Sequence, residues 1–334
     1  MKYYKINKIK NVCKTTGKVQ IFVLVALLCV ITNCKKATLS PQTEFVIGTV
    51  CTVNLFEDGT QEIYKKIFAR LKKIDDVFSS TREDSVLNEV NRQSGIAPVH
   101  VPEDFFLVVK RALYFAKISD GAFDPSIGPL VKTWGIGTKA EHIPQENDLQ
   151  KALELVDYND VIADESAQTI FLVKQGMALD LGGIAKGFAA DELVSIIKNE
   201  GVKKALIDLG GNIYVLGNKN PPWRIGIQDP SAEQRGSYIG FVEVETSSLV
   251  TSGIYERFFE EGGVRYHHIL STKTGFPVDS NIASVTIINE NSAGNYISMD
   301  ADALSTTLFA IGFDEGCRIL KSFPNISAIF VMSD

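Results

Sequence analysis

Three short segments of the chain carry side chains whose types and spacing could do chemistry. In the first, Asp302 precedes Thr306 by four residues, so on a helix the two side chains lie on one face, one turn apart. A carboxylate and a hydroxyl are oxygen ligands of the kind that Mg²⁺ accepts. The pair is common, however, and alone does not indicate a metal. Asp300 is rotated off this face, and we expect it to cap the helix.

The second segment joins a strand end to a helix through two glycines. It runs from Asp180 through Gly182 and Gly183 to Lys186, which would lie in the first turn of the helix. Amides at a helix start bind phosphate, and a lysine there adds a positive charge. The spacing matches neither common glycine motif for nucleotides, so a structural turn with Asp180 as the helix cap and Lys186 in solvent stays open. The same Asp-Leu-Gly-Gly pattern recurs at residues 208–211.

The third segment places two of the four histidines, His267 and His268, together at the end of a predicted strand. Successive side chains of a strand point to opposite faces, so at most one of them serves a given site. Such a histidine could act as an acid or base. Packing as an ordinary core or surface residue is the alternative.

Apolar spacing predicts the elements that position these segments. Apolar residues recur every three or four positions over 60–78, the period of an amphipathic helix. We also predict helices at 102–119, 149–156, 184–199 and 301–322, the last open to a break at Gly312. Runs of β-forming residues predict a hairpin over 161–173 and strands at 205–209, 212–216, 223–228, 237–246, 264–270, 282–288 and 327–332. Helices first and strands later predict an α+β fold with a largely antiparallel sheet, in which 42–334 forms one domain.

The amino-terminal segment resembles an export signal. Residues 1–33 contain six lysines and no acidic residue, and an apolar run of about a dozen residues precedes Cys34, a length that suits a signal peptide better than a membrane span. The run ends in a segment that resembles a bacterial lipobox. We therefore predict a signal peptide at 1–33, a lipid on Cys34, a tether at 34–41, and a body anchored to the inner membrane facing the periplasm. An uncleaved signal anchor is the alternative.

Charge and cysteine content narrow the classes of function. The net charge of -6 becomes -12 without residues 1–33, because the remaining chain has 28 basic and 40 acidic residues. Such a body cannot hold nucleic acid by general phosphate neutralisation, which requires clustered Lys and Arg. Only Cys51 and Cys317 remain beyond Cys34, so we expect no disulfide framework.

Taken together, the segments resemble the ApbE family, the bacterial FAD:protein FMN transferases, including spirochaetal members. The motifs occur in the family's order along nearly the whole mature chain. They are Ile47–Thr49, Phe78–Ser85 with Asn91, Gly121–Leu130 with Trp134, the two Asp-Leu-Gly-Gly segments, the strand of His268 and the helix of Asp302 and Thr306.

The resemblance implies a function and a set of site residues. Such enzymes use Mg²⁺ to transfer FMN from FAD, their substrate, to a threonine hydroxyl of an acceptor flavoprotein, for example a subunit of an Rnf- or Nqr-type redox complex, and release AMP. His268 and Asp302 are implied as catalytic, with one of the carboxylates as an alternative base. The metal ligands implied are Gly183 through its carbonyl, Asp302 and Thr306. The flavin contacts implied are Ile47, Thr81, Ala122, Phe123, Asp124, Asp180, Lys186, Ile269 and Leu270.

Two departures from the family pattern keep other activities open. Thr81 stands where the family commonly has tyrosine, and threonine cannot stack on an aromatic ring. Ser271-Thr272 replaces the usual Asp-Pro after the histidine. Weaker clamping of FAD would let water compete with the protein hydroxyl, so hydrolysis of FAD to FMN and AMP, alone or as a second activity, is the alternative. A flavin-binding lipoprotein without catalysis is a third hypothesis.

Overall fold

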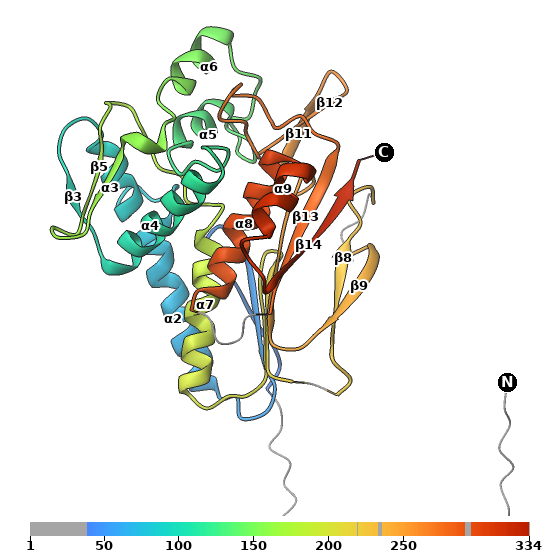
Figure 1. Cartoon of the computed structure of the whole chain (residues 1–334). Coiled ribbons are helices and arrows are strands. Elements are labelled where there is room, and N and C mark those ends of the chain that lie inside the picture. Colours follow the sequence, from blue (N-terminus) through green and yellow to red (C-terminus); the bar gives the residue numbers. More distant parts are fainter. Residues whose placement is uncertain (1–38, 219, 233–235, 291–294, 334) are drawn as a thin grey trace, which may run out of the picture. The chain divides into compact units, whose positions relative to one another are not determined.

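Strands with alternating burial form the centre of the protein. In β2 (Thr49–Leu55), Cys51, Val53 and Leu55 are buried while the residues between them are more exposed, as expected where one face of a sheet is packed. The computed structural model (Figure 1) describes residues 39–218, 220–232, 236–290 and 295–333. Its main sheet has seven antiparallel strands in the order β1-β2-β6-β7-β10-β13-β14. The other strands are β1 (Gln42–Val46), β6 (Ala205–Leu209), β7 (Asn212–Leu216), β10 (Ser247–Gly253), β13 (Ile282–Asn289) and β14 (Ile326–Met332).

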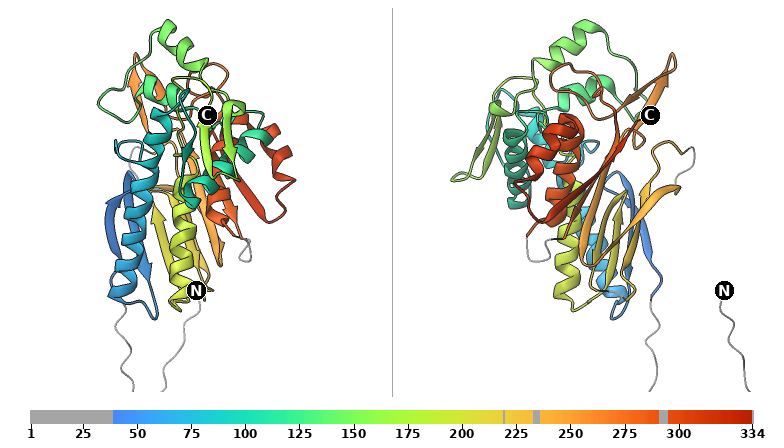
Figure 2. Two further views of the ribbon diagram at one scale, coloured as in Figure 1. Left: turned by 90° about the vertical axis from the view of Figure 1, so that its left-hand side faces the viewer. Right: turned by 45° about the vertical axis from the view of Figure 1, so that its right-hand side comes forward.

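Helices cover one face of this sheet and a β-hairpin covers part of the other (Figure 2). The helices on the sheet are α2 (Gln61–Phe78), α7 (Ala185–Asn199) and α8 (Ile297–Ile311), followed by α9 (Phe313–Leu320). Strands β8 (Trp223–Gln228) and β9 (Tyr238–Val244) form the hairpin. The hairpin packs Trp223 against the sheet residues Val215 and Leu249.

Helix α8 is buried on almost all sides. Only four of its fifteen residues are not buried, and Asp302 is among the buried ones. A helix that is apolar around most of its circumference belongs in the interior, and α8 packs against α4, α7, β10 and β13. A buried polar side chain on α8 must therefore find a hydrogen-bond partner, either on these neighbours or on a carbonyl of the helix itself, as Thr307 does with Ala303.

A second region lies beyond one end of the main sheet. It contains α3 (Val86–Arg92), α4 (Glu103–Ile118), α5 (Gly128–Trp134), α6 (Glu146–Leu153) and the short 3₁₀ helix η1 (Tyr158–Asp160). A small sheet has the order β3-β5-β4, and β11 pairs with β12. Helices α5 and α6 gather Leu130, Leu149 and Leu270 around Trp134, whose indole donates a hydrogen bond to the Gly275 carbonyl at 2.7 Å. Helices α3 and α4 and the small sheet contribute instead to the main core. The strands are β3 (Val99–His100), β4 (Val161–Asp164), β5 (Thr169–Leu172), β11 (Phe258–Glu261) and β12 (Val264–His267).

The predicted α+β class with a largely antiparallel sheet is confirmed. The hairpin over 161–173 and the helices at 60–78, 102–119 and 184–199 are found within a residue or two, and the break at Gly312 divides α8 from α9. Other boundaries were wrong. The helix predicted from residue 301 begins at Ile297, the one predicted at 149–156 spans Glu146–Leu153, and the strand predicted at 264–270 ends at His267. Strands β1, β2 and β10 and helices α3 and α5 were not predicted.

The predictions for the amino terminus fall almost wholly outside the described residues, since Cys34 and residues 1–33 precede them. Within the described part of the chain, no helix combines the length and the apolar character that a membrane span requires. Cys51 and Cys317 are both free thiols.

The close packing of α7 on α8 depends on Gly187. A Cβ placed there would lie 2.2 Å from the Ser298 carbonyl oxygen and 2.6 Å from Met299 Cα, and backbone cannot move aside as a side-chain end can. We expect Gly187→Ala to lower the free energy of unfolding by about 1–3 kcal/mol, the usual cost of overpacking, in a urea titration. Gly240→Ala is the control, because no atom lies within 4 Å of a Cβ there. Equal stability of the two variants would contradict the packing argument.

Candidate functional site

The predicted site residues converge at one end of the main sheet. The turns Ile47-Gly48 and Gly210-Gly211 and the end of β10 all lie there, because neighbouring strands are antiparallel. The turns also touch, since a Cβ at Gly210 would lie 2.0 Å from Thr49 Oγ1. Segment 180–186 joins this end through Gly183, which lies beside Thr306 of α8.

Two carboxylates tie α7 and α8 together reciprocally. Asp302 of α8 accepts a hydrogen bond from the Gly187 amide in the first turn of α7 at 2.9 Å. Asp191 of α7 accepts from the amides of Ser298 and Met299 in the first turn of α8, at 3.0 and 2.8 Å. Amides in the first turn have no partner within their own helix, and the helix dipole favours a negative charge there. Each helix therefore supplies the cap of the other.

Asp302 keeps one oxygen for the site. Its Oδ2 is bonded to Gly187, and its Oδ1 lies 3.6 Å from the Lys186 ammonium. Its side chain is only 3% exposed, so this oxygen faces a nearly closed space beside a positive charge. Lys186 also donates to the Gly182 carbonyl at 3.0 Å, which folds its side chain back over the glycine turn.

The expected cap at Asp300 and the alternative of a cap at Asp180 are both wrong. Asp300 does not cap α8, because its two oxygens are each 2.6 Å from the Arg111 guanidinium; the cap is Asp191, which lies in another helix. Asp180 does not cap α7 either. Its Oδ1 accepts from the Gly182 amide at 2.8 Å, closing a local turn, and Ile184 occupies the cap position. Before Asp180 the structure has only an isolated bridge between Ile127 and Ala178 instead of a strand.

The glycine turn passes close to α8 and has unpaired backbone amides. A Cβ at Gly183 would lie 3.3 Å from Thr306 Oγ1 and 3.2 Å from the Phe123 ring, so a side chain there would fill the space between turn and helix. Among the described residues, the amides of Gly183 and Lys186 donate no hydrogen bond. Two unpaired amides at a helix start are suited to an anion.

The donor set at this point fits Mg²⁺. The Asp302 Oδ1, the Thr306 hydroxyl and the Gly183 carbonyl are all oxygen atoms, which Mg²⁺ prefers, and it commonly completes its shell with water and phosphate oxygens. Within the described ranges there is no group of three or more His, Cys, Asp or Glu side chains that could hold a metal. A metal held here would therefore depend on one carboxylate and on neutral oxygens.

The two histidines have different environments. His267 is buried, donates through Nε2 to the Val278 carbonyl at 3.1 Å, and accepts from the Ile269 amide through Nδ1. His268 Nδ1 lies 3.2 Å from the Arg257 carbonyl. Because a carbonyl only accepts, Nδ1 carries the proton and Nε2 of the neutral ring keeps its lone pair. Of the two rings, only that of His268 thus keeps a nitrogen that can accept a proton. The expected alternation of strand side chains does not apply to it, because β12 ends at His267.

The predicted flavin contacts form two groups. Phe123, Ile269 and Leu270 are buried, and Asp124 is used internally, since its carboxylate accepts from Ser126 and from the Tyr158 amide. The second group, Ile47 and Thr81, lies near the end of α2. The Ile47 amide bonds Asp75 of that helix, and exposed Thr81 follows three residues after its end.

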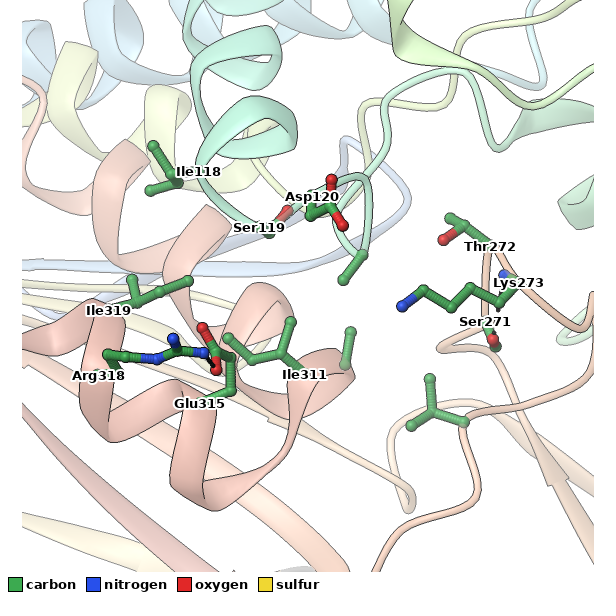
Figure 3. A pocket seen from close by; sticks show the side chains of 13 residues that line it. Ile118, Ser119, Asp120, Ser271, Thr272, Lys273, Ile311, Glu315, Arg318 and Ile319 are labelled. Atoms are coloured by element: carbon green, nitrogen blue, oxygen red, sulfur yellow. Dashed lines mark hydrogen bonds and ion pairs between the residues drawn. The ribbon is translucent and has the colours of Figure 1, made fainter.

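A cavity of about 510 Å³ adjoins the first group. It lies between the end of α4, the turn at 271–273 and helices α8 and α9, and its lining includes Ala122 and Ala310. Ala310 is one turn beyond Thr306 on α8. In Figure 3 the Lys273 side chain extends toward the hollow, and Glu315 and Arg318 of α9 form an ion pair on the opposite side.

Sequence reasoning missed residues that support the site. Asp191 and Ser252 were not singled out, although Ser252 Oγ lies 3.1 Å from Thr306 Oγ1. A carboxylate five residues after Lys186 is an ordinary feature of a helix surface. Its partners on α8 are more than a hundred residues away, and no local spacing signals such a contact.

Comparison with known proteins identifies similar chains. A model described as the ApbE family matches residues 47–330. The chain is 38% identical to a protein named FAD:protein FMN transferase from Treponema pallidum, over 94% of this chain and 91% of that one. It is 38% identical to one of the same name from Klebsiella pneumoniae, covering 86% and 87%.

Solved structures of similar proteins share the fold of this chain. The ApbE protein of Thermotoga maritima superposes with a TM-score of 0.78 at 32% identity, covering 88% of this chain and 94% of that one. The flavin transferase ApbE from Vibrio cholerae superposes with a TM-score of 0.77 at 26% identity, covering 88% and 93%.

We expect His268 to stay neutral between pH 5 and 8. Burial, with the positive charge of Arg257 and more weakly that of Lys186, lowers its pKa to about 3. The folded protein thus binds fewer protons than the unfolded chain between pH 3 and 6.5, so this contribution to stability is complete above pH 6.5 and is lost as the pH falls. NMR of the imidazole nitrogens, assigned with His268→Gln, checks this. A midpoint near pH 6.5 would contradict it.

Proposed function

The chain belongs to the ApbE family, and from this premise we propose that it is an FAD:protein FMN transferase. Flavin transfer from FAD is what the names of its relatives support. The finer proposal is that it moves FMN to a threonine hydroxyl of an acceptor flavoprotein, depends on Mg²⁺ and releases AMP. The observation that carries this is the meeting of Lys186, Asp302, Thr306 and Gly183 at the start of α7.

The start of α7 suits the pyrophosphate of FAD. Two unpaired amides, those of Gly183 and Lys186, and the Lys186 ammonium would face the phosphate oxygens, and both kinds of group bind phosphate. Asp302, Thr306 and the Gly183 carbonyl would hold Mg²⁺, which supplies neutralisation of the negative charge on the phosphates. Phosphoryl transfer depends mainly on such positioning and charge stabilisation.

His268 would serve as the base for the acceptor hydroxyl. Its Nε2 lone pair is available in the neutral ring, whereas both nitrogens of His267 are bonded internally. In the proposed step the threonine oxygen bonds to the FMN phosphorus, and the bond from that phosphorus to the AMP phosphate oxygen breaks. AMP leaves with the electron pair, and the threonine proton would pass to His268, whose pKa of about 3 in the free protein would rise beside the negative phosphates of bound FAD.

FAD hydrolysis is the second candidate, and one observation favours it. Thr81 is exposed at the end of α2 and bonds only Ser79 among the described side chains, so it offers no ring for an aromatic ligand to stack on. In this reading water replaces the threonine hydroxyl as the attacking group, and FMN and AMP are the products.

The proposal also covers the location of the protein in the cell. We propose that Cys34 carries a lipid, that the body faces the periplasm from the inner membrane, and that the acceptors include flavoprotein subunits of Rnf- or Nqr-type redox complexes. Only seven residues separate Cys34 from the first strand at Gln42. This short tether would keep the site near other membrane-bound proteins.

Replacement of Asp302 tests the enzymatic site. We expect Asp302→Ala to reduce AMP release from FAD and Mg²⁺ at least about 100-fold, the order of a lost electrostatic contact to a transition state, as measured by chromatography of the products. Asp300→Ala is the matched control on the same helix. It breaks the pair with Arg111 and should lower stability while AMP release persists. Unchanged release by Asp302→Ala would refute the assignment.

Replacement of Thr81 separates transfer from hydrolysis. We expect Thr81→Tyr to tighten FAD binding about 2- to 10-fold, since a ring contact adds about 0.5–1.5 kcal/mol, and to raise the ratio of protein-bound to free FMN when an acceptor domain is present. Thr81→Leu adds apolar bulk without a π-system and serves as control. An acceptor that stays unlabelled with wild type while AMP accumulates would leave only the hydrolase.

A further inference from the structure

A row of hydroxyl groups connects Thr306 with the interior of α8. Ser252, near the end of β10, lies 3.1 Å from Thr306 and 2.8 Å from Ser305, measured between the hydroxyl oxygens. The Ser305 hydroxyl also lies 2.8 Å from the carbonyl oxygen of Asp302. Ser305 is fully buried, whereas Thr306 and Ser252 are half-buried. The row thus extends from the buried side of α8 to the edge of the site.

The direction of each hydrogen bond follows from counting protons. A carbonyl oxygen only accepts, so the single proton of Ser305 goes to Asp302 O. Ser305 must then accept from Ser252, which uses the single proton of Ser252. Ser252 in turn can only accept from Thr306. The chain of donors therefore runs from Thr306 to Ser252, to Ser305 and to the Asp302 carbonyl.

This direction orients the Thr306 hydroxyl. Its proton points toward Ser252 on the sheet, so its lone pairs remain available to another partner. The hydroxyl also borders the space beside Gly183, since a Cβ placed on that glycine would lie 3.3 Å from Thr306 Oγ1. A cation is attracted to a lone pair and repelled by a hydroxyl proton. Mutation of a group that orients a metal ligand commonly lowers the affinity for the metal 10- to 100-fold.

We propose that Ser252 is a positioning residue that turns the Thr306 hydroxyl into a lone-pair donor for the divalent cation. The inference rests on the metal site of the proposed function and deepens it, since Ser252 itself need not touch the metal. The last acceptor of the relay is the carbonyl of Asp302, the residue whose carboxylate is the charged ligand. The backbone of one ligand thus fixes the hydroxyl of the other.

Ser248 offers a matched control. It lies four residues before Ser252 on the same strand and also donates a buried hydroxyl–hydroxyl bond to α8, to Ser298 at 2.9 Å. Ser298 passes its proton to Asn212 at 2.8 Å, so this second row ends far along the helix from Thr306. Ser248→Ala and Ser252→Ala remove the same atoms from the same interface.

The experiment measures Mn²⁺ binding to the full protein by the electron paramagnetic resonance signal of the free ion. We expect Ser252→Ala to raise the dissociation constant roughly 10- to 100-fold, while Ser248→Ala stays within about twofold of wild type. Both variants should melt at a lower temperature. Ser305→Ala, which removes the acceptor of the Ser252 proton, should also weaken Mn²⁺ binding and provides the test if Ser252→Ala does not fold.

The other possible results separate a failure of the positioning role from a failure of the metal site. Wild-type affinity in Ser252→Ala, or an equal loss in Ser248→Ala, overturns the positioning role and leaves the proposed function intact. A wild-type protein that binds no Mn²⁺ overturns the metal site and the relay together.

Discussion

The arrangement of the site depends on the mutual capping of α7 and α8. Each helix begins with amides that have no partner of their own, and each supplies a carboxylate, Asp191 or Asp302, to the start of the other. Gly187 permits the contact, because no side chain stands between the backbones. These three hydrogen bonds fix how far α8 is shifted along α7. They therefore decide where Thr306 lies relative to the glycine turn.

The two buried carboxylates that cap the helices also contribute to the charge of the site. Burial raises the pKa of Asp191 to about 7, although the α8 amides oppose the rise. Asp302 bonds one amide and keeps its second oxygen beside Lys186. A body with 28 basic and 40 acidic residues beyond the leader would repel a polyanion at long range. Under the proposed function, FAD would therefore be bound by local groups: the Lys186 ammonium, unpaired amides and a cation held by a few oxygens.

The sequence predicted long, periodic elements well and short or edge elements poorly. Helix α2 has five turns with a regular apolar stripe. Helices α3 and α5 have only seven residues each, which is too short for the spacing of apolar residues to reveal a helical period. Strand β1 was missed because its outward Phe45, 76% exposed, removes the contrast between its faces. The sequence placed Asp302 and Thr306 on one helix, as the structure has them in α8, whereas the residues alone gave no choice between the two histidines. The cap from Asp191 and the relay through Ser252 could not, because both join residues distant in sequence.

The proposed function requires the capped helix pair to hold a divalent cation against the pyrophosphate of FAD. The most direct measurement is the anomalous diffraction of Mn²⁺ in crystals of the protein grown with FAD. We expect one peak within about 2.0–2.3 Å of Asp302 Oδ1, Thr306 Oγ1 and the Gly183 carbonyl, with phosphate oxygens of FAD completing the shell. A bound FAD whose pyrophosphate lies at the start of α7 without a metal there, or a peak at other side chains, would contradict it.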